Sequence, residues 1–240
     1  RCEDRSLSGE GVMNEGYLST TLGLPGIPAM AETQEVAKII EVAIGTDAIV
    51  VIQTASSERS LKIIKRAKSE TNKISVEVSI NHLLLNENLC DGFNTSAKFK
   101  PPLKSEQTRQ KLLNILKSGD IDYITAAHAP KSVTKKDLAF EEASFGVELI
   151  DSYLPICYGG LVSSGIISLS ELVRLTSFNQ AKLLGLNKGE IKEGFDADLV
   201  LFDPKSTTTV DKNFSPYNGM EFESKVKYNI NKGKIVFANT

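Results

Sequence analysis

The chain is poor in the residues that most metal and nucleic-acid sites need. Its 240 residues include no tryptophan, two histidines and three cysteines. With 28 basic against 30 acidic residues, it lacks the excess of positive charge typical of nucleic-acid binding. The Lys-rich stretch from Lys62 to Lys73 is best interpreted as the solvated face of a helix, because mixed charge along a helix marks an exposed surface.

Long apolar segments are also missing. No run approaches the roughly 20 residues that a membrane helix needs, and no signal peptide is visible. Cys2, Cys90 and Cys157 are odd in number and far apart, which indicates reduced thiols and no Cys-based metal site. We therefore expect a cytoplasmic globular protein with no membrane partner, and the 41% hydrophobic content is sufficient for a sizeable core.

Strands and helices are expected to alternate along the first half of the chain. β-branched runs predict strands, and amphipathic runs between them predict helices. The expected strands are 48–54, 74–80 and 121–126, and the expected helices are 27–43, 56–69 (with Ser56 as N-cap) and 106–117. A polar loop is expected over 86–96. This alternation is typical of an α/β fold with a parallel sheet.

The pattern changes towards the carboxyl end. Helical regions are expected over 146–163, interrupted at Pro155, and over 170–184, with a capping box from Ser168. Beyond residue 189, short strands are expected over 197–202 and in a hairpin over 226–237. These strands are expected to share a core with the preceding part of the chain. The residues expected to be buried in it are Phe195, Leu199, Leu201, Ile230 and Val236.

The most informative segment is Ala126–Ser132, with the sequence Ala-Ala-His-Ala-Pro-Lys-Ser, which follows a buried strand. Catalytic groups of α/β barrels lie at the carboxyl ends of the strands. A metal site at this point would use a carboxylate at Ala127, and the chain has only a methyl group there.

Together with its surroundings, this segment closely resembles the dihydroorotase family and, more widely, the cyclic amidohydrolases. Family members carry Asp-His-Ala-Pro-His where this chain has residues 127–131. The other matching stretches are Gly-Leu-Pro-Gly-Ile-Pro at 23–28, Glu-Val-Ser-Ile-Asn-His-Leu at 77–83, Lys-Phe-Lys-Pro-Pro-Leu-Lys at 98–104, Ser-Phe-Gly-Val-Glu at 144–148 and the glycine- and aspartate-containing run 188–203.

The resemblance implies a fold and a domain organisation. We expect an α/β fold in which residues 1–188 form the C-terminal half of a TIM-type (β/α) barrel and residues 189–240 a small β domain. By the same resemblance, the first half of the barrel is expected to be absent from this chain, including the strand that carries two paired histidines.

The resemblance also identifies the positions of three zinc ligands. Active relatives bind zinc through histidines, a carboxylated lysine or aspartate, and the aspartate of Asp-His-Ala-Pro-His. The corresponding positions here are Arg1, Gln53 and Ala127. Zinc prefers imidazole, thiolate or carboxylate ligands, whereas arginine has no lone pair to offer and alanine has no donor. We therefore expect no metal and no cofactor, although zinc is the cofactor of active relatives.

Loss of the carboxylate removes a second function. In relatives, the group at the Ala127 position is the general base that takes a proton from the metal-bound water. Without metal and base, neither activation of water nor proton transfer to the leaving nitrogen is provided. We expect no catalytic residues, and we interpret His128 and His82 as structural because neither has an acidic or metal partner near it in sequence.

Four residues are candidates for binding a ligand in the former pocket. Lys100 replaces the family's asparagine before Pro-Pro-Leu, and Lys131 replaces the last histidine of Asp-His-Ala-Pro-His. Phe145 and Gly146 match the backbone segment that contacts the pyrimidine-like ring in relatives. Surface lysines and a retained barrel segment are the simpler interpretations of these residues.

Three functional hypotheses follow. The first is a catalytically inactive dihydroorotase homologue of pyrimidine metabolism that acts as a structural or partner-binding protein, with aspartate transcarbamoylase or a second copy of the chain as partner. The second is an active zinc-dependent cyclic amidohydrolase. The third is a metal-free protein that binds an anionic metabolite through Lys100 and Lys131.

Overall fold

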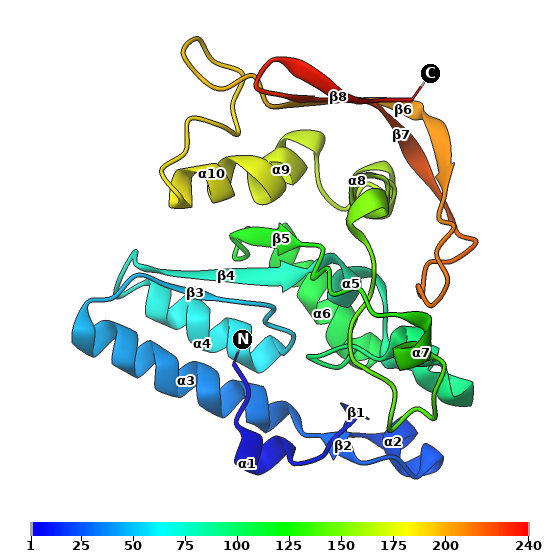
Figure 1. Ribbon diagram of the computed structural model, residues 1–240. Coiled ribbons are helices and arrows are strands. Elements are labelled where there is room, and N and C mark those ends of the chain that lie inside the picture. Colours follow the sequence, from blue (N-terminus) through cyan, green and yellow to red (C-terminus); the bar gives the residue numbers. More distant parts are fainter. Residues whose placement is uncertain (1, 240) are drawn as a thin grey trace. The chain divides into compact units, whose positions relative to one another are not determined.

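The computed structural model describes residues 2–239 (Figure 1). The chain divides into two compact units. Unit 1 comprises the residues up to Leu149 together with Asn213–Pro216, and unit 2 comprises Ile150–Lys212 and the residues from Tyr217 onward. Unit 2 thus groups the helices before residue 188 with the C-terminal strands. The expected division at residue 188 separates a barrel from a β domain and stays a prediction.

Unit 1 is built on a parallel three-stranded sheet in the order β3-β4-β5. The strands are β3 (Val50–Ile52), β4 (Ile74–Ser79) and β5 (Tyr123–Thr125). Val50 pairs with Ile74, and Glu77 pairs with Tyr123. A separate parallel pair joins β1 (Met13–Asn14) to β2 (Gly26–Ile27). The three expected strands of the α/β pattern are therefore confirmed.

Helices connect these strands. Figure 1 shows α3 (Ala29–Thr46) and α4 (Glu58–Lys68) on the same side of β3 and β4. The connection from β4 to β5 contains α5 (Ile80–Leu84), the 3-10 turns η1 (Glu87–Phe93) and η2 (Thr95–Ala97), and α6 (Glu106–Lys117). The shorter helices of unit 1 are α1 (Arg5–Ser8), α2 (Tyr17–Leu22) and α7 (Val133–Lys136).

Helix α6 illustrates why these segments are helical. The hydroxyl of Ser105 accepts the backbone N–H of Thr108, which caps the first turn. Glu106 lies at the amino end and Lys117 at the carboxyl end, where each charge is stabilised by the helix dipole. Leu112, Leu113 and Leu116 are buried, so one face packs into the core.

Two local expectations in unit 1 were wrong. The N-cap of α4 is Ser57, not Ser56, because the backbone N–H and the hydroxyl of Ser56 both donate to the buried carboxylate of Glu32. The expected loop 86–96 contains 3-10 turns. Asparagine side chains cap these turns: Asn86 accepts from the N–H of Asn88, and Asn94 accepts from the N–H of Ser96.

Unit 2 contains two helical segments and an antiparallel sheet. The first segment joins η3 (Ile150–Ser152), α8 (Tyr153–Cys157) and the π-helical turn η4 (Tyr158–Ser163). Pro155 does not interrupt it, because a proline in the first turn of a helix removes no required N–H. The second segment joins α9 (Leu169–Val173), η5 (Arg174–Phe178) and α10 (Asn179–Leu183), and the expected capping box between Ser168 and Glu171 is present.

The sheet of unit 2 has the order β6-β7-β8, with β6 (Leu199–Thr209), β7 (Glu221–Asn231) and β8 (Lys234–Ala238). Strands β7 and β8 form the expected hairpin. Its two turn residues, Lys232 and Gly233, have φ angles of 49° and 74°, as a tight turn matching the strand twist requires.

The burial predicted for the C-terminal strands was wrong. Leu201 is 45% exposed and Val236 is 62% exposed, while Phe195, Leu199 and Ile230 are only half-buried. The helices of unit 2 contact this sheet at two points: the ring of Tyr158 packs edge-on against Phe202, and Gly159 lies against Phe222. All five residues of β8 are exposed, because no layer of unit 2 packs over that strand.

Candidate functional site

The carboxyl ends of β3, β4 and β5 lie at the same edge of the sheet, since the strands are parallel. Gln53 follows β3 and is exposed. Asn81 follows β4 and is fully buried, and its amide Nδ2 donates to the carbonyl oxygen of Ala126 at 3.1 Å. Gln53 and Ala127, at which the resemblance places two later metal ligands, therefore lie at the same edge of the sheet, on strands separated by β4. Arg1, the third such position, lies outside the described residues.

Ala127 has a left-handed backbone conformation, with a φ of 48°. Its N–H donates to the hydroxyl of Thr125 at 3.2 Å. Among residues other than glycine, aspartate and asparagine adopt this conformation most readily, because their short polar side chains stabilise it locally. The backbone at this position would therefore accept an aspartate without rearrangement, although alanine occupies it.

The described residues do not fit a zinc ion. Within residues 2–239, no group of three or more histidine, cysteine, aspartate or glutamate side chains is placed to hold a metal. At the strand ends, Gln53 presents a neutral amide and Ala127 presents a methyl group. Neither is a ligand that zinc prefers.

His128 is exposed and belongs to a backbone connection between two loops. Its backbone pairs with Val147 in a parallel bridge, and the N–H of Ala129 donates to the carbonyl of Val147 at 2.8 Å. The N–H of Leu149 donates to Nδ1 of His128 at 3.0 Å. The imidazole thus accepts a structural hydrogen bond, which agrees with the structural interpretation of this residue.

His82 is buried, with 3% of its surface exposed. Its Nε2 lies 3.2 Å from the carbonyl oxygen of Pro101, and its ring meets Phe99 edge-on. Burial, followed by repulsion from Lys104, lowers the pKa of His82 to about 4. A neutral imidazole packed below the surface supports a structural role for this residue as well.

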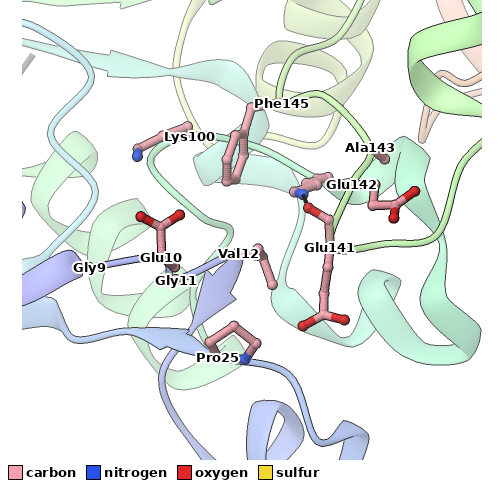
Figure 2. Close-up of a pocket in the computed structure, with 11 residues that line it drawn as sticks. Gly9, Glu10, Gly11, Val12, Pro25, Lys100, Glu141, Glu142, Ala143 and Phe145 are labelled. Atoms are coloured by element: carbon pink, nitrogen blue, oxygen red, sulfur yellow. Dashed lines mark hydrogen bonds between the residues drawn. The ribbon is translucent and has the colours of Figure 1, made fainter.

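A separate cavity of about 430 Å³ lies in unit 1 (Figure 2). Two of the four candidate ligand-binding residues, Lys100 and Phe145, line it, whereas Lys131 and Gly146 do not. Figure 2 shows Phe145 beside Lys100, with the carboxylate of Glu10 pointing toward the space below them. The remaining lining residues are Gly9, Gly11, Val12, Pro25, Lys98, Glu141, Glu142 and Ala143.

The charges around this cavity do not favour an anion. Lys100 forms an ion pair with Glu3, with 2.8 Å between Nζ and Oε1. The ammonium of Lys98 lies 4.6 Å from the ring centroid of Phe145, and that of Lys100 lies 5.3 Å from it. Glu10, Glu141 and Glu142 add three carboxylates to the lining. Phe145 is therefore already in contact with two cations of the protein itself.

Sequence reasoning missed three buried lysines. Lys98, Lys104 and Lys136 are between 2% and 5% exposed. Burial lowers the pKa of each, and that of Lys136 falls to about 8. Lysine is almost never fully buried unless it is paired, so a surface position was the default expectation. The family-like stretch 98–104 was a signal for Lys98 and Lys104, whereas Lys136 had none.

The model of the amidohydrolase family matches residues 4–236. The chain belongs to the amidohydrolase family. Among curated relatives, the dihydroorotase of Ruminiclostridium cellulolyticum is 38% identical over 98% of this chain, and the dihydroorotase of Caldanaerobacter subterraneus is 37% identical over 98% of it. Each alignment covers 56% of the relative, so this chain spans about half the length of the curated relatives it matches.

Solved structures show the same fold. The D-hydantoinase (dihydropyrimidinase) from Thermus sp. superposes with a TM-score of 0.87 at 23% identity, covering 99% of this chain and 56% of that one. The dihydropyrimidinase from Brevibacillus agri superposes with a TM-score of 0.83 at 26% identity, covering 98% of this chain and 54% of that one.

No helix within residues 2–239 has both the length and the apolar character needed to cross a membrane.

Proposed function

We propose that this chain is a dihydroorotase-like member of the amidohydrolase family that has lost zinc-dependent catalysis and acts as a structural or partner-binding homologue. In this proposal, residues 1–188 correspond to half of a TIM-type barrel and residues 189–240 to its small β domain. The protein would work in pyrimidine metabolism in the cytoplasm, with aspartate transcarbamoylase or a second copy of the chain as partner.

The observation that carries the proposal is the pair of side chains at the carboxyl ends of β3 and β5, Gln53 and Ala127. The backbone at Ala127 has a left-handed conformation that suits an aspartate, yet the side chain is a methyl group. Gln53 lies exposed at the end of β3 and offers an amide. A family-like fold combined with side chains that do not suit zinc supports a protein whose shape is used without catalysis.

The alternative of an active cyclic amidohydrolase rests on the relatives, which are named dihydroorotases at 36–38% identity. It would require metal ligands from outside the described residues. Such ligands would have to act without a carboxylate at Ala127, and so without the group that shuttles the proton in active relatives. For this reason we place the non-catalytic function first.

The decisive experiment measures metal content and activity together on the purified full-length protein. We expect much less than one equivalent of zinc and no hydrolysis of dihydroorotate, even after zinc is added. The dihydroorotase of R. cellulolyticum, prepared in parallel, serves as the active control. Zinc near one equivalent, or turnover that a chelator abolishes, would reverse the ranking of the two functions.

A further inference from the structure

One wall of the 430 Å³ cavity is formed by a segment that two buried lysines hold in place. The segment 140–146 follows α7 and contributes Glu141, Glu142, Ala143 and Phe145 to the lining. It has no regular secondary structure of its own apart from turns. Its position must therefore come from contacts with the rest of unit 1.

The contacts are made by ammonium groups. Nζ of Lys98 donates to the carbonyl oxygens of Phe140 and Glu141, at 2.6 and 2.9 Å. Nζ of Lys136 donates to the carbonyl oxygens of Ser144 and Gly146, at 3.2 and 3.0 Å. Four carbonyls within seven residues are thus bound by two side chains that are each 2% exposed.

Backbone bonds join the same parts. The N–H of Ser144 donates to the carbonyl of Lys135 at 2.8 Å, and the N–H of Gly146 donates to the carbonyl of Lys98 at 3.1 Å. The hydroxyl of Thr95 donates to the carbonyl of Lys136 at 2.8 Å. The two lysines and the wall therefore form one connected network, so a change at either ammonium acts on the wall directly.

The electrostatic surroundings oppose the charge on Lys136, whereas those of Lys98 are mixed. Carbonyl dipoles stabilise an ammonium less than a carboxylate does, and both lysines are removed from water. The charged groups that act on Lys136 are Lys98 and Lys131, which are both positive. Those that act on Lys98 are Glu141, which favours its charge, and Lys100, which opposes it.

We infer that Lys98 and Lys136 are the positioning residues of the cavity wall, and that their buried like charges make segment 140–146 a pH-responsive element that closes more firmly in alkaline solution. The inference concerns the shape of the cavity and is independent of whether the chain is catalytic.

The direction follows from proton linkage. In the closed wall, the pKa of Lys136 is about 8, lowered first by burial and then by repulsion from Lys98 and Lys131. When the segment opens, Lys136 enters water and its pKa returns to the ordinary value of 10.5. Between these values the open form binds more protons, so a rise in pH favours the closed form. Below about pH 8 both forms are charged, and the balance is constant.

Hydrogen exchange followed by mass spectrometry tests this directly on the full chain between pH 6.5 and 9.5. After correction for the pH dependence of intrinsic exchange, protection of the amides of Ala143, Ser144 and Gly146 should stay level to about pH 8. It should then rise roughly 30-fold by pH 9.5, since one linked proton gives up to about tenfold per pH unit. Peptides from α6 are the internal control and should show no such rise. A level profile in 140–146, or an equal rise in α6, would overturn the inference.

Two variants assign the effect. Lys136→Met keeps the apolar stem and removes the titrating nitrogen, so the rise should disappear. Lys131→Met changes an exposed residue and removes one like charge, so the rise should begin at a higher pH, and this variant keeps the test valid if Lys136→Met does not fold. Lys117→Met, on the exposed end of α6, is the matched control and should match wild type. A rise that persists in Lys136→Met, or an unshifted onset in Lys131→Met, would refute the assignment.

Discussion

The backbone N–H of Leu149 donates a hydrogen bond of 3.0 Å to Nδ1 of His128. His128 is the histidine of the segment that resembles the dihydroorotase motif, and its neighbour Ala127 takes the place of an acidic ligand. Because Nδ1 accepts this bond, the neutral ring carries its proton on Nε2. The residue thus helps to fix two adjoining loops, a role that requires no metal ion.

We predict that restoring the two strand-end ligands will not restore catalysis. The double variant Gln53→His, Ala127→Asp should fold, because the φ of 48° at residue 127 suits aspartate. It should still fail to hydrolyse dihydroorotate, since Arg1, Lys100 and Lys131 remain at family-altered positions. Thermal unfolding and a zinc-supplemented assay check the two halves of this prediction. Chelator-sensitive turnover by the double variant would show that those three positions are not obstacles.

The sequence was sufficient to predict the elements that local patterns determine. The bounds of α6 matched those expected, and the capping box at Ser168 is present, because side-chain spacing and capping act within a few residues. The αβ alternation and the family were also predictable. The strand-end positions Gln53 and Ala127 could be located from motifs alone.

What sequence could not predict depends on contacts distant in the chain. Ser56 has a residue type that favours an N-cap, but it donates its hydrogen bonds to the buried carboxylate of Glu32, 24 residues away. Leu201 and Val236 look like core residues, and their exposure depends on which part of a sheet is covered. Lys98 and Lys136 are buried because carbonyls of a later segment surround their ammoniums, and no local pattern indicates this.

A second prediction concerns the close approach of Gly146 to the loop that follows His128. Its φ is 127°, and a Cβ added there would lie 2.3 Å from the carbonyl oxygen of Ala129. Gly146→Ala should therefore lower the free energy of unfolding by about 3 kcal/mol, from backbone strain together with the clash. Gly45→Ala is the matched control. That position in α3 has open space and no positive φ, so the change should be neutral or stabilising by up to about 1 kcal/mol.

Chemical denaturation of both variants and of wild type measures the differences in free energy of unfolding. Equal stability of Gly146→Ala and wild type would mean that the loop around Ala129 moves aside at little cost, and that the approach seen here is not a constraint.

A third prediction follows from His82, whose pKa falls to about 4 in the folded protein, from burial first and Lys104 second. In the unfolded chain the pKa of His82 is near 6.5, so the unfolded state binds the proton first as the pH falls. The contribution of the neutral imidazole to the free energy of unfolding is therefore fully present above about pH 6.5. It is lost as the pH falls towards 4, by roughly 3 kcal/mol in all.

Urea unfolding of wild type and His82→Gln at half-unit steps from pH 7 to 4 tests this. The difference in unfolding free energy between the two proteins should narrow steadily as the pH falls, because glutamine does not titrate. A constant difference would show that His82 is not the source of acid sensitivity.

A fourth prediction is that the three cysteines are unreactive in the folded protein. Cys2, Cys90 and Cys157 are all buried free thiols. Burial raises the pKa of Cys2 to about 11 and that of Cys90 to about 12, and it raises the pKa of Cys157 further. Since the thiolate is the reactive form, an aromatic disulfide reagent at pH 8 should modify fewer than one thiol within minutes. The same reagent should titrate three thiols in guanidinium chloride, and rapid native labelling would contradict the burial described here.

The last prediction concerns assembly. If catalysis has been lost, the constraint that preserves the family-like fold should lie on a surface that binds another protein. Three consecutive apolar side chains are exposed on strand β8: Ile235 and Val236 are each 62% exposed and Phe237 is 48% exposed. Apolar residues clustered in this way are typical of surfaces that are covered in an assembly. We therefore expect the protein to form a homo-oligomer or a complex with aspartate transcarbamoylase.

Light scattering coupled to size exclusion at micromolar concentration, with and without that enzyme, measures the mass of the assembly directly. Val236→Lys should weaken whichever assembly forms, whereas Lys62→Glu, on the exposed face of α4, should leave it intact. A monomer under both conditions would remove the main reason for assigning this protein a scaffold role.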